Sequence, residues 1–179
     1  LFYYLSVPLL HVFGAQIMAT RVTSALLGIV TIAGTMALGK ALFRGWRERS
    51  ALALLAGAWL AVNGAQVWLT RQGFRTSPQP LLEALCVWLL VVGLNRSRRW
   101  HIPLLLAGVF GGLSLYVYMA ARVFPLWLLL PLVFLIGIDG SRRGLRLRQA
   151  LWFGAVLAVT ALPIVGFYTA HPDVFLDRL

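Results

Sequence analysis

Arginines whose spacing could hold an anion stand out in this otherwise apolar sequence. The segment TRQGFRTSPQP carries Arg71 and Arg75 with no acidic residue to neutralise them, and Arg122 lies between two further apolar runs. A guanidinium group matches phosphate oxygens with two parallel hydrogen bonds, and a fixed pair of such groups matches them better. We therefore predict that Arg71, Arg75 and Arg122 bind the phosphate of a ligand.

Aromatic, histidine and acidic side chains stand close to similar apolar runs. In LYVYMAARVFP, Tyr118 precedes Arg122 by four residues, so both would share one face of a helix. GFYTAHPDVF contributes His171 and Asp173. With Arg21, these side chains are our candidates for a substrate pocket. Two plainer interpretations stay open, because interfacial tyrosines commonly form an aromatic belt and a histidine before proline is typical of a turn.

No residue qualifies as a general base or a metal ligand, and the catalytic residue is unknown. The three histidines are far apart, and neither a metal-ligand cluster nor a glycine-rich phosphate loop is present in the sequence. We expect Glu83 to pair with Arg75. The arginines could instead extend to lipid phosphates or pair with Glu83, Asp173 and Asp177. The sequence thus predicts an anion site with no visible cofactor.

Long apolar runs must position these residues. Of the 179 residues, 60% are hydrophobic and 12% are charged, and the mean hydropathy is +0.84. A helix crosses the hydrocarbon core with about 20 apolar residues. We predict six spans: Val22–Gly39, Ser50–Thr70, Thr76–Asn95, Trp100–Ala121, Val123–Ile138 and Gln149–Ala170.

These runs predict an all-α, polytopic transmembrane helix bundle, because backbone amides in lipid require helices or a closed barrel and the runs do not alternate. Leu1–Ala19 is either a further span or a helix at the interface, and Pro163 predicts a kink. Small residues every fourth position, such as Ala53 and Gly57 or Gly108 and Gly112, predict close packing between helices. We interpret residues 1–179 as one membrane domain, a fragment of a longer one.

Basic residues alternate between the two sides of the predicted membrane. Eleven of the sixteen fall in one set of turns: Lys40, Arg44, Arg47, Arg49, Arg96, Arg98, Arg99, Arg142, Arg143, Arg146 and Arg148. Because basic residues favour the cytoplasmic side, this set predicts a multi-pass protein of the plasma membrane with Arg21, Arg71, Arg75 and Arg122 on the extracytoplasmic face. The same topology explains the net charge of +11, so we reject a nucleic-acid partner.

Several segments resemble the polytopic glycosyltransferases of the GT-C class, specifically glycosyltransferase family 39, which includes protein O-mannosyltransferases and aminoarabinose transferases. LFYYLSVPLLHVFG is similar to the segment after the family's His-Pro-Pro motif, and ATRVTSALLGIVTIAGTMALGKALF to its Arg-x-x-Ser-Ala-Leu-x-Gly helix. TRQGFRTSPQPLLEAL resembles the family's outer loop, in which many members have Ser-Arg-x-x-Phe-Arg. GGLSLYVYMAARVFPLWLLL resembles a helix pair of the family that carries a basic residue near the lipid phosphate. HPDVFLDR is similar to the family's His-Pro-x-x-Phe segment.

The resemblance implies transfer of a sugar from a polyprenyl-phosphate donor to an acceptor on the extracytoplasmic face. The acceptor is unknown. In this family the catalytic Asp or Glu lies in the first outer loop, which would precede Leu1, so we expect the fragment alone to be inactive. Several members carry an Asp near the position of Thr76, where this chain has arginine and threonine. A divalent metal in the full-length enzyme is compatible with the resemblance.

Two other classes of function stay open. A lipid or anion transporter, such as a flippase, would carry charges at mid-span and a pair of interrupted helices. The sequence predicts neither. In a non-catalytic membrane scaffold, the outer arginines would have no ligand to bind.

Overall fold

The computed structural model describes residues 2–14, 17–96, 98–117, 121 and 123–170, and all regular elements in these ranges are helices. This confirms the all-α prediction. The elements are α1 (Phe2–Phe13), α2 (Ile17–Leu42), α3 (Arg49–Val62), α4 (Gly64–Gln72), α5 (Gln79–Leu94), α6 (His101–Ser114), α7 (Phe124–Ile138), the short 3₁₀ helix η2 (Gly140–Arg142) and α8 (Arg143–Ala170).

Two helical segments are long and apolar enough to cross a membrane. They are α2 and the continuous stretch Gly140–Ala170, and the bent pair of α3 and α4 would make a third. Helices α1, α5, α6 and α7 are apolar but shorter, and the 12 residues of α1 rise only about 18 Å at 1.5 Å per residue. These lengths fit a membrane protein, while the six predicted spans stay a prediction.

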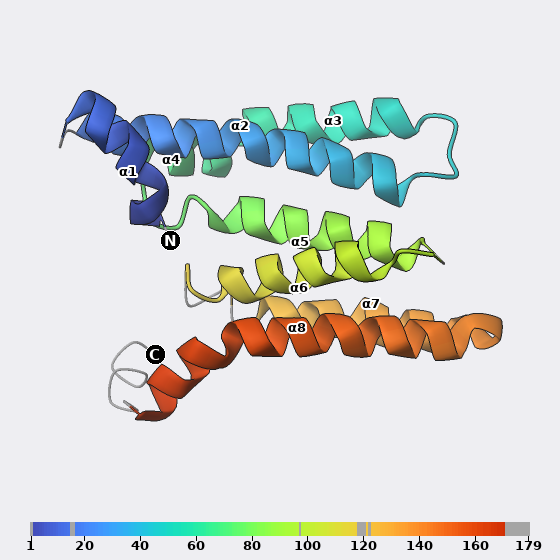
Figure 1. Ribbon diagram of the computed structural model, residues 1–179. Helices are drawn as coiled ribbons and strands as arrows, with labels where there is room; N and C mark the ends of the chain where they lie inside the picture. Colours follow the sequence, from blue (N-terminus) through green and yellow to red (C-terminus); the bar gives the residue numbers. More distant parts are fainter. Residues whose placement is uncertain (1, 15–16, 97, 118–120, 122, 171–179) are drawn as a thin grey trace.

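Helices α2, α3, α5, α6, α7 and α8 lie side by side with their axes nearly parallel, and in this order each runs opposite to the one before (Figure 1). Helix α2 packs against α3 and α5, α5 against α6, and α6 against α8. The turns after α2, α5 and α7 lie at one end of the molecule. The start of α2 and the ends of α4, α6 and α8 lie at the other end, so sequence-distant residues share it.

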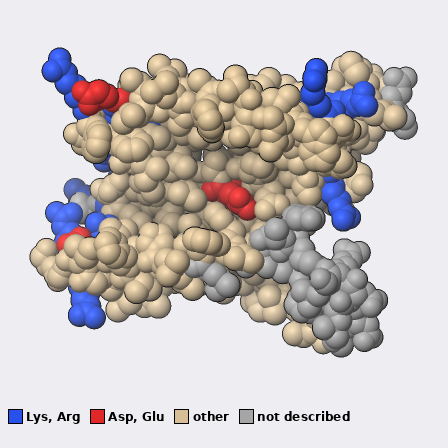
Figure 2. Space-filling view, turned by 180° about the vertical axis from the view of Figure 1, so that it is seen from behind, with Lys and Arg blue, Asp and Glu red and all other residues tan. Residues whose placement is uncertain are grey.

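The sides of the helices expose large apolar side chains. Trp59 of α3 is 74% exposed, Leu130 of α7 66% and Leu151 of α8 65%. Figure 2 shows the same pattern on one face, with Lys and Arg gathered at the two ends and, between them, a largely uncharged belt that contains one acidic patch near its middle. A water-soluble monomer rarely exposes so continuous an apolar surface, whereas lipid would cover it.

Small residues bring the helix backbones together as the sequence predicts. A Cβ atom added to Gly39 would lie 3.1 Å from the Ala53 Cα, and one added to Gly57 would lie 2.5 Å from the Met36 Cγ. Between α6 and α8, a Cβ atom at Gly112 would lie 2.5 Å from the Thr160 Cβ. The predicted packing at Ala53, Gly57, Gly108 and Gly112 therefore occurs within the molecule. Ala61 and Ala65, which continue the spacing of the first stripe in the sequence and were expected to pack with it, are exposed.

The prediction of one uninterrupted helix over Ser50–Thr70 is wrong. The helix breaks at Asn63, and its two parts, α3 and α4, are bent by 57°. The Asn63 side-chain oxygen accepts hydrogen bonds from the amides of Ala65 and Gln66, at 3.1 and 3.2 Å. An asparagine that caps a new helix in this way competes with the continuing backbone hydrogen bonds.

Two other boundaries differ from the predicted ones. Helix α8 begins at Arg143, so basic residues that we expected in a turn are helical. Helix α6 ends at Ser114, seven residues before the predicted end of its span at Ala121. The ribbon of α8 changes direction near its last turns, where Pro163 lies, as expected for a proline inside a helix (Figure 1).

Candidate anion-binding site

Two of the predicted site arginines line one open hollow between α2 and α4. It has a volume of about 470 Å³, and it is lined by Met18, Arg21, Val22, Ala25, Thr70, Arg71 and Gln72. Arg21 and Arg71 supply two positive charges, and no acidic side chain is among these lining residues. Met18, Val22 and Ala25 supply an apolar wall, so the hollow has the chemistry to hold an anionic head beside an apolar chain.

Close backbone packing fixes the two helix segments that carry Arg21 and Arg71 relative to each other. A Cβ atom at Gly28 would lie 2.5 Å from the Thr70 Cγ2, so only glycine lets α4 approach α2 here. Gly73 ends α4 with φ +70°, a left-handed conformation that glycine adopts without strain. Its Cα faces the backbone of Thr20 and Arg21, where an added Cβ would lie 3.3 Å from the Thr20 carbonyl carbon.

A buried hydroxyl pair holds the following loop on α2. The Ser24 hydroxyl donates to the Ser77 hydroxyl oxygen at 2.8 Å, and both side chains are at most 1% exposed. The rings of Trp68 and Phe74 also pack at a centroid distance of 5.1 Å. The loop that carries Arg75 is therefore anchored to α2 through Ser77 and to α4 through Phe74.

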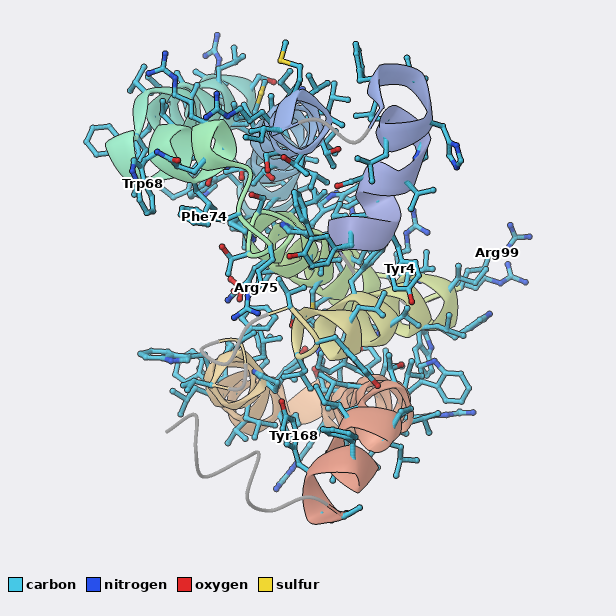
Figure 3. All side chains as sticks on the ribbon, turned by 90° about the vertical axis from the view of Figure 1, so that its left-hand side faces the viewer. Tyr4, Trp68, Phe74, Arg75, Arg99 and Tyr168 are labelled. Carbon is cyan, nitrogen blue, oxygen red and sulfur yellow. The ribbon has the colours of Figure 1, made fainter. Side chains whose placement is uncertain are left out.

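Arg75 is not among the residues that line this hollow. In Figure 3, which looks along the helices from this end, Arg75 lies between the half of the molecule formed by α2–α5 and the half formed by α6–α8. Its expected partner, Glu83, instead accepts a hydrogen bond from the Gln79 amide at 2.9 Å. Among the described residues the one ion pair joins Arg146 and Asp139, so the predicted Arg75–Glu83 pair is wrong. Gln79, one helical turn from Glu83, is the partner found for its carboxylate.

Four predicted site residues lie outside the described residues: Tyr118, Arg122, His171 and Asp173. The neighbouring Tyr116 is described, and its hydroxyl donates to the Thr160 carbonyl at 2.8 Å. Tyr116 thus joins the turn after α6 to α8. Within the described ranges, no group of three His, Cys, Asp or Glu side chains could hold a metal ion.

Sequence reasoning placed Arg21 in the substrate pocket and Arg71 at the donor phosphate, and it missed that both line one hollow. The signal that could have indicated this is the small residue Gly28, about two helical turns after Arg21 on the same face of α2. It lies opposite α4, the short helix that Asn63 caps. Without the break at Asn63, the direction of α4 relative to α2 could not be predicted.

Fold and site together define an all-helical chain with membrane-length apolar helices and a two-arginine hollow at one end. Comparisons with family models, with curated proteins and with solved structures found no match.

Proposed function

We propose that this chain forms part of an integral-membrane glycosyltransferase that moves a sugar from a polyprenyl-phosphate donor to an acceptor on the extracytoplasmic face. The observation that carries the proposal is the hollow where Arg21 and Arg71 meet beside an apolar wall. A prenyl phosphate has the matching chemistry, a compact anion on a hydrocarbon chain. The sequence resemblance to the GT-C class points to the same donor.

The proposed topology has six passes through the plasma membrane. Helices α2 and α8 and the bent pair α3–α4 supply three, and α5, α6 and α7, with 14 to 16 residues each, would cross with flanking residues reaching outward. The turns after α2, α5 and α7, together with the helix ends beside them, carry most of the basic residues, which favours the cytoplasmic side for that end. Arg21 and Arg71 then face the extracytoplasmic side.

The arginines would stabilise negative charge and would not transfer protons. As the sugar leaves its donor, negative charge builds on the phosphate, and guanidinium groups fixed beside it stabilise that charge. Arg71 and Arg21 would supply this stabilisation in the hollow, with Arg75 and Arg122 as the further predicted phosphate ligands. The acceptor hydroxyl must lose a proton to a base. By the resemblance, that base would be a carboxylate in the family's first outer loop.

The test is sugar transfer by the full-length protein with Arg71, Arg75 or Arg122 replaced by Ala. Removing a group that stabilises transition-state charge lowers the turnover number about 100-fold. The matched control is Arg47→Ala, which removes the same charge from the turn between α2 and α3, at the opposite end of the molecule, and leaves the hollow intact. Transfer within about twofold of wild type in all three variants would reject the phosphate site.

A second candidate, a lipid or anion transporter, is favoured by one observation. The break between α3 and α4 resembles the discontinuous helices that bind substrates in transporters. Close to it, the Gln66 side-chain nitrogen is buried with no hydrogen-bond partner among the described residues. In vesicles, movement of a labelled polyprenyl phosphate between leaflets without sugar transfer would support this candidate against the transferase.

A further inference from the structure

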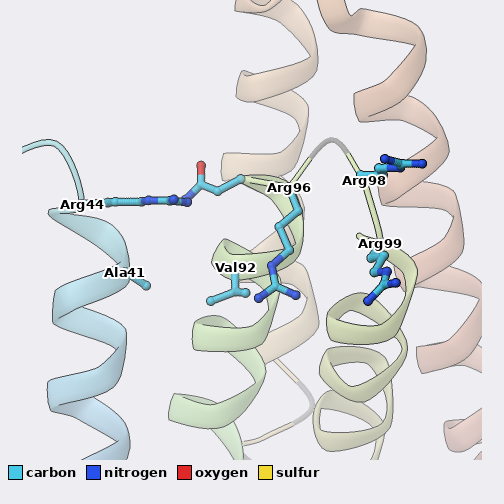
Figure 4. Close-up of a pocket in the computed structure, with 7 residues that line it drawn as sticks. Ala41, Arg44, Val92, Arg96, Arg98 and Arg99 are labelled. Atoms are coloured by element: carbon cyan, nitrogen blue, oxygen red, sulfur yellow. The ribbon is translucent and has the colours of Figure 1, made fainter.

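A second, larger hollow lies at the opposite end of the molecule. It has a volume of about 600 Å³ and lies where the end of α2 faces the turn between α5 and α6 (Figure 4). Four arginines dominate its lining, which consists of Ala41, Arg44, Val92, Asn95, Arg96, Arg98 and Arg99. No acidic side chain is among these residues.

The arginines approach the hollow from two elements. In Figure 4, Arg44 extends from the end of α2 toward the end of α5, and the Arg96 side chain runs back along α5 beside Val92. Arg98 and Arg99 lie on the α6 side of the turn. The hollow therefore combines guanidinium groups with the apolar side chains of Ala41 and Val92, which lie toward the middle of the molecule.

Helix α8 fixes the turn that carries three of these arginines. The buried Gln149 amide donates to the carbonyls of Gly93 and Arg96, at 3.3 and 3.2 Å. Arg146 donates to the Leu94 carbonyl and pairs with Asp139 at 3.2 Å. These bonds satisfy carbonyl groups at the end of α5, so the position of the turn does not depend on the arginines that line the hollow.

Arg99 adopts an unfavourable backbone conformation at this turn. Its φ is 57°, and it is the one residue other than glycine with a positive φ in the described ranges. Glycine or asparagine would adopt this conformation more easily than arginine. Residues with such strained backbones often lie at functional sites, where the role of the side chain outweighs the energetic cost of the backbone conformation.

The positive charges of the hollow are not neutralised from within the described ranges. The one ion pair there joins Arg146 and Asp139, and neither residue lines the hollow. Four arginines around one hollow repel each other, and an anion placed among them relieves that repulsion. Membrane topology needs basic residues near this end, but it does not need them around a common hollow.

We propose that this hollow binds the phosphate headgroup of an anionic phospholipid. The bound group is a lipid rather than a free anion, because the hollow is partly lined by Ala41 and Val92, and the apolar side chain of Leu42, next to Ala41 in the chain, is exposed. Basic pockets between membrane helices on the cytoplasmic side are suited to such headgroups. The inference requires that the helices lie in a membrane, but it does not depend on sugar transfer.

The test titrates the purified chain in mild detergent with phosphatidylglycerol and with phosphatidylcholine, and it counts bound lipids by native mass spectrometry. We expect preferential binding of phosphatidylglycerol. The double variant Arg44→Gln/Arg96→Gln should weaken it about 25-fold, or about fivefold for each arginine. The matched control, Arg47→Gln/Arg142→Gln, removes two charges from the same end outside the hollow. Its affinity should stay within about twofold of wild type.

Equal losses in the double variant and the control would overturn the proposal, because general charge would then explain the binding. Full displacement of phosphatidylglycerol by equimolar inorganic phosphate would also overturn it, because the site would then bind a soluble anion. Arg99→Gly keeps the proposal testable if the double variant does not fold. This variant should weaken lipid binding about fivefold. It should not lower the unfolding temperature, because glycine adopts a positive φ without strain. Unchanged binding in this variant would contradict the proposal.

Discussion

Single arginines in this chain behave in two ways according to their neighbours. Arg146 is held by Asp139 and by a backbone carbonyl, so its charge stabilises the turn after α5. Arg21 and Arg71 line a hollow without an acidic residue. A charge that no protein group neutralises is available to a ligand, which is why the second pair, and not Arg146, is a candidate site.

Asn63 decides where the predicted second span breaks, and this can be tested with one substitution. Asn63→Ala removes the side-chain oxygen that accepts from the amides of Ala65 and Gln66. We expect the free energy of unfolding to fall by about 1 kcal/mol, as for the loss of other helix N-caps. The measurement is reversible denaturation in detergent, followed by circular dichroism.

The control for this prediction is Asn95→Ala. Asn95 follows α5, and it is exposed without a side-chain cap bond. Its replacement should change the free energy of unfolding by less than about 0.5 kcal/mol. Equal losses in both variants would show that the Asn63 cap is not what stabilises the break.

Helix pairs are held together mainly where glycine lets their backbones approach. Along α6, Gly108 and Gly112 face Val156 and Thr160 of α8, and a Cβ at either position would overlap its neighbour. In lipid, where apolar burial gives little driving force between helices, such close packing supplies much of the association energy.

Two glycine substitutions should have opposite effects on stability. Gly112→Ala places a Cβ 2.5 Å from the Thr160 Cβ, so α6 and α8 must separate, and we expect a loss of about 1–3 kcal/mol. Gly154→Ala in α8 meets nothing within 4 Å and should stabilise the helix by about 0.5–1 kcal/mol. Unfolding free energies of the two variants measure this difference, and a stabilising Gly112→Ala would contradict the packing.

At the scale of the whole molecule, the helices divide the charges between two ends. The turns after α2, α5 and α7, with the helix ends beside them, hold most basic residues at one end (Figure 1). Arg21 near the start of α2 and Arg71 near the end of α4 lie at the other end. The apolar belt between the ends fits the hydrocarbon core of a membrane. Whether the bent pair α3–α4 crosses that core is the central topological question.

Cysteine labelling can answer it. Ser50→Cys and Gln72→Cys introduce exposed thiols near the two ends of the α3–α4 pair, in a Cys86→Ala background that removes the buried native thiol. If the pair spans the membrane, an impermeant maleimide added to intact cells should label Gln72→Cys and not Ser50→Cys. Labelling of both variants from outside would show that the pair enters and leaves on one side.

The sequence by itself determined the all-helical class and most helix positions, because hydrophobic run length and the absence of alternation follow from local chemistry. It also indicated the packing glycines and the separation of charges between two ends. Helix boundaries were less predictable, as at Ser114 and Arg143, because they depend on capping and on neighbouring helices.

Only the tertiary structure decided which arginines meet. Arg21 and Arg71 are 50 positions apart, and they share a hollow because the chain bends at Asn63 and α4 packs closely on Gly28. Arg44 and Arg96 meet because α2 and α5 end at the same level. Such meetings depend on the angle and register between helices, which arise from side-chain contacts between distant segments and leave no periodic signal in the sequence.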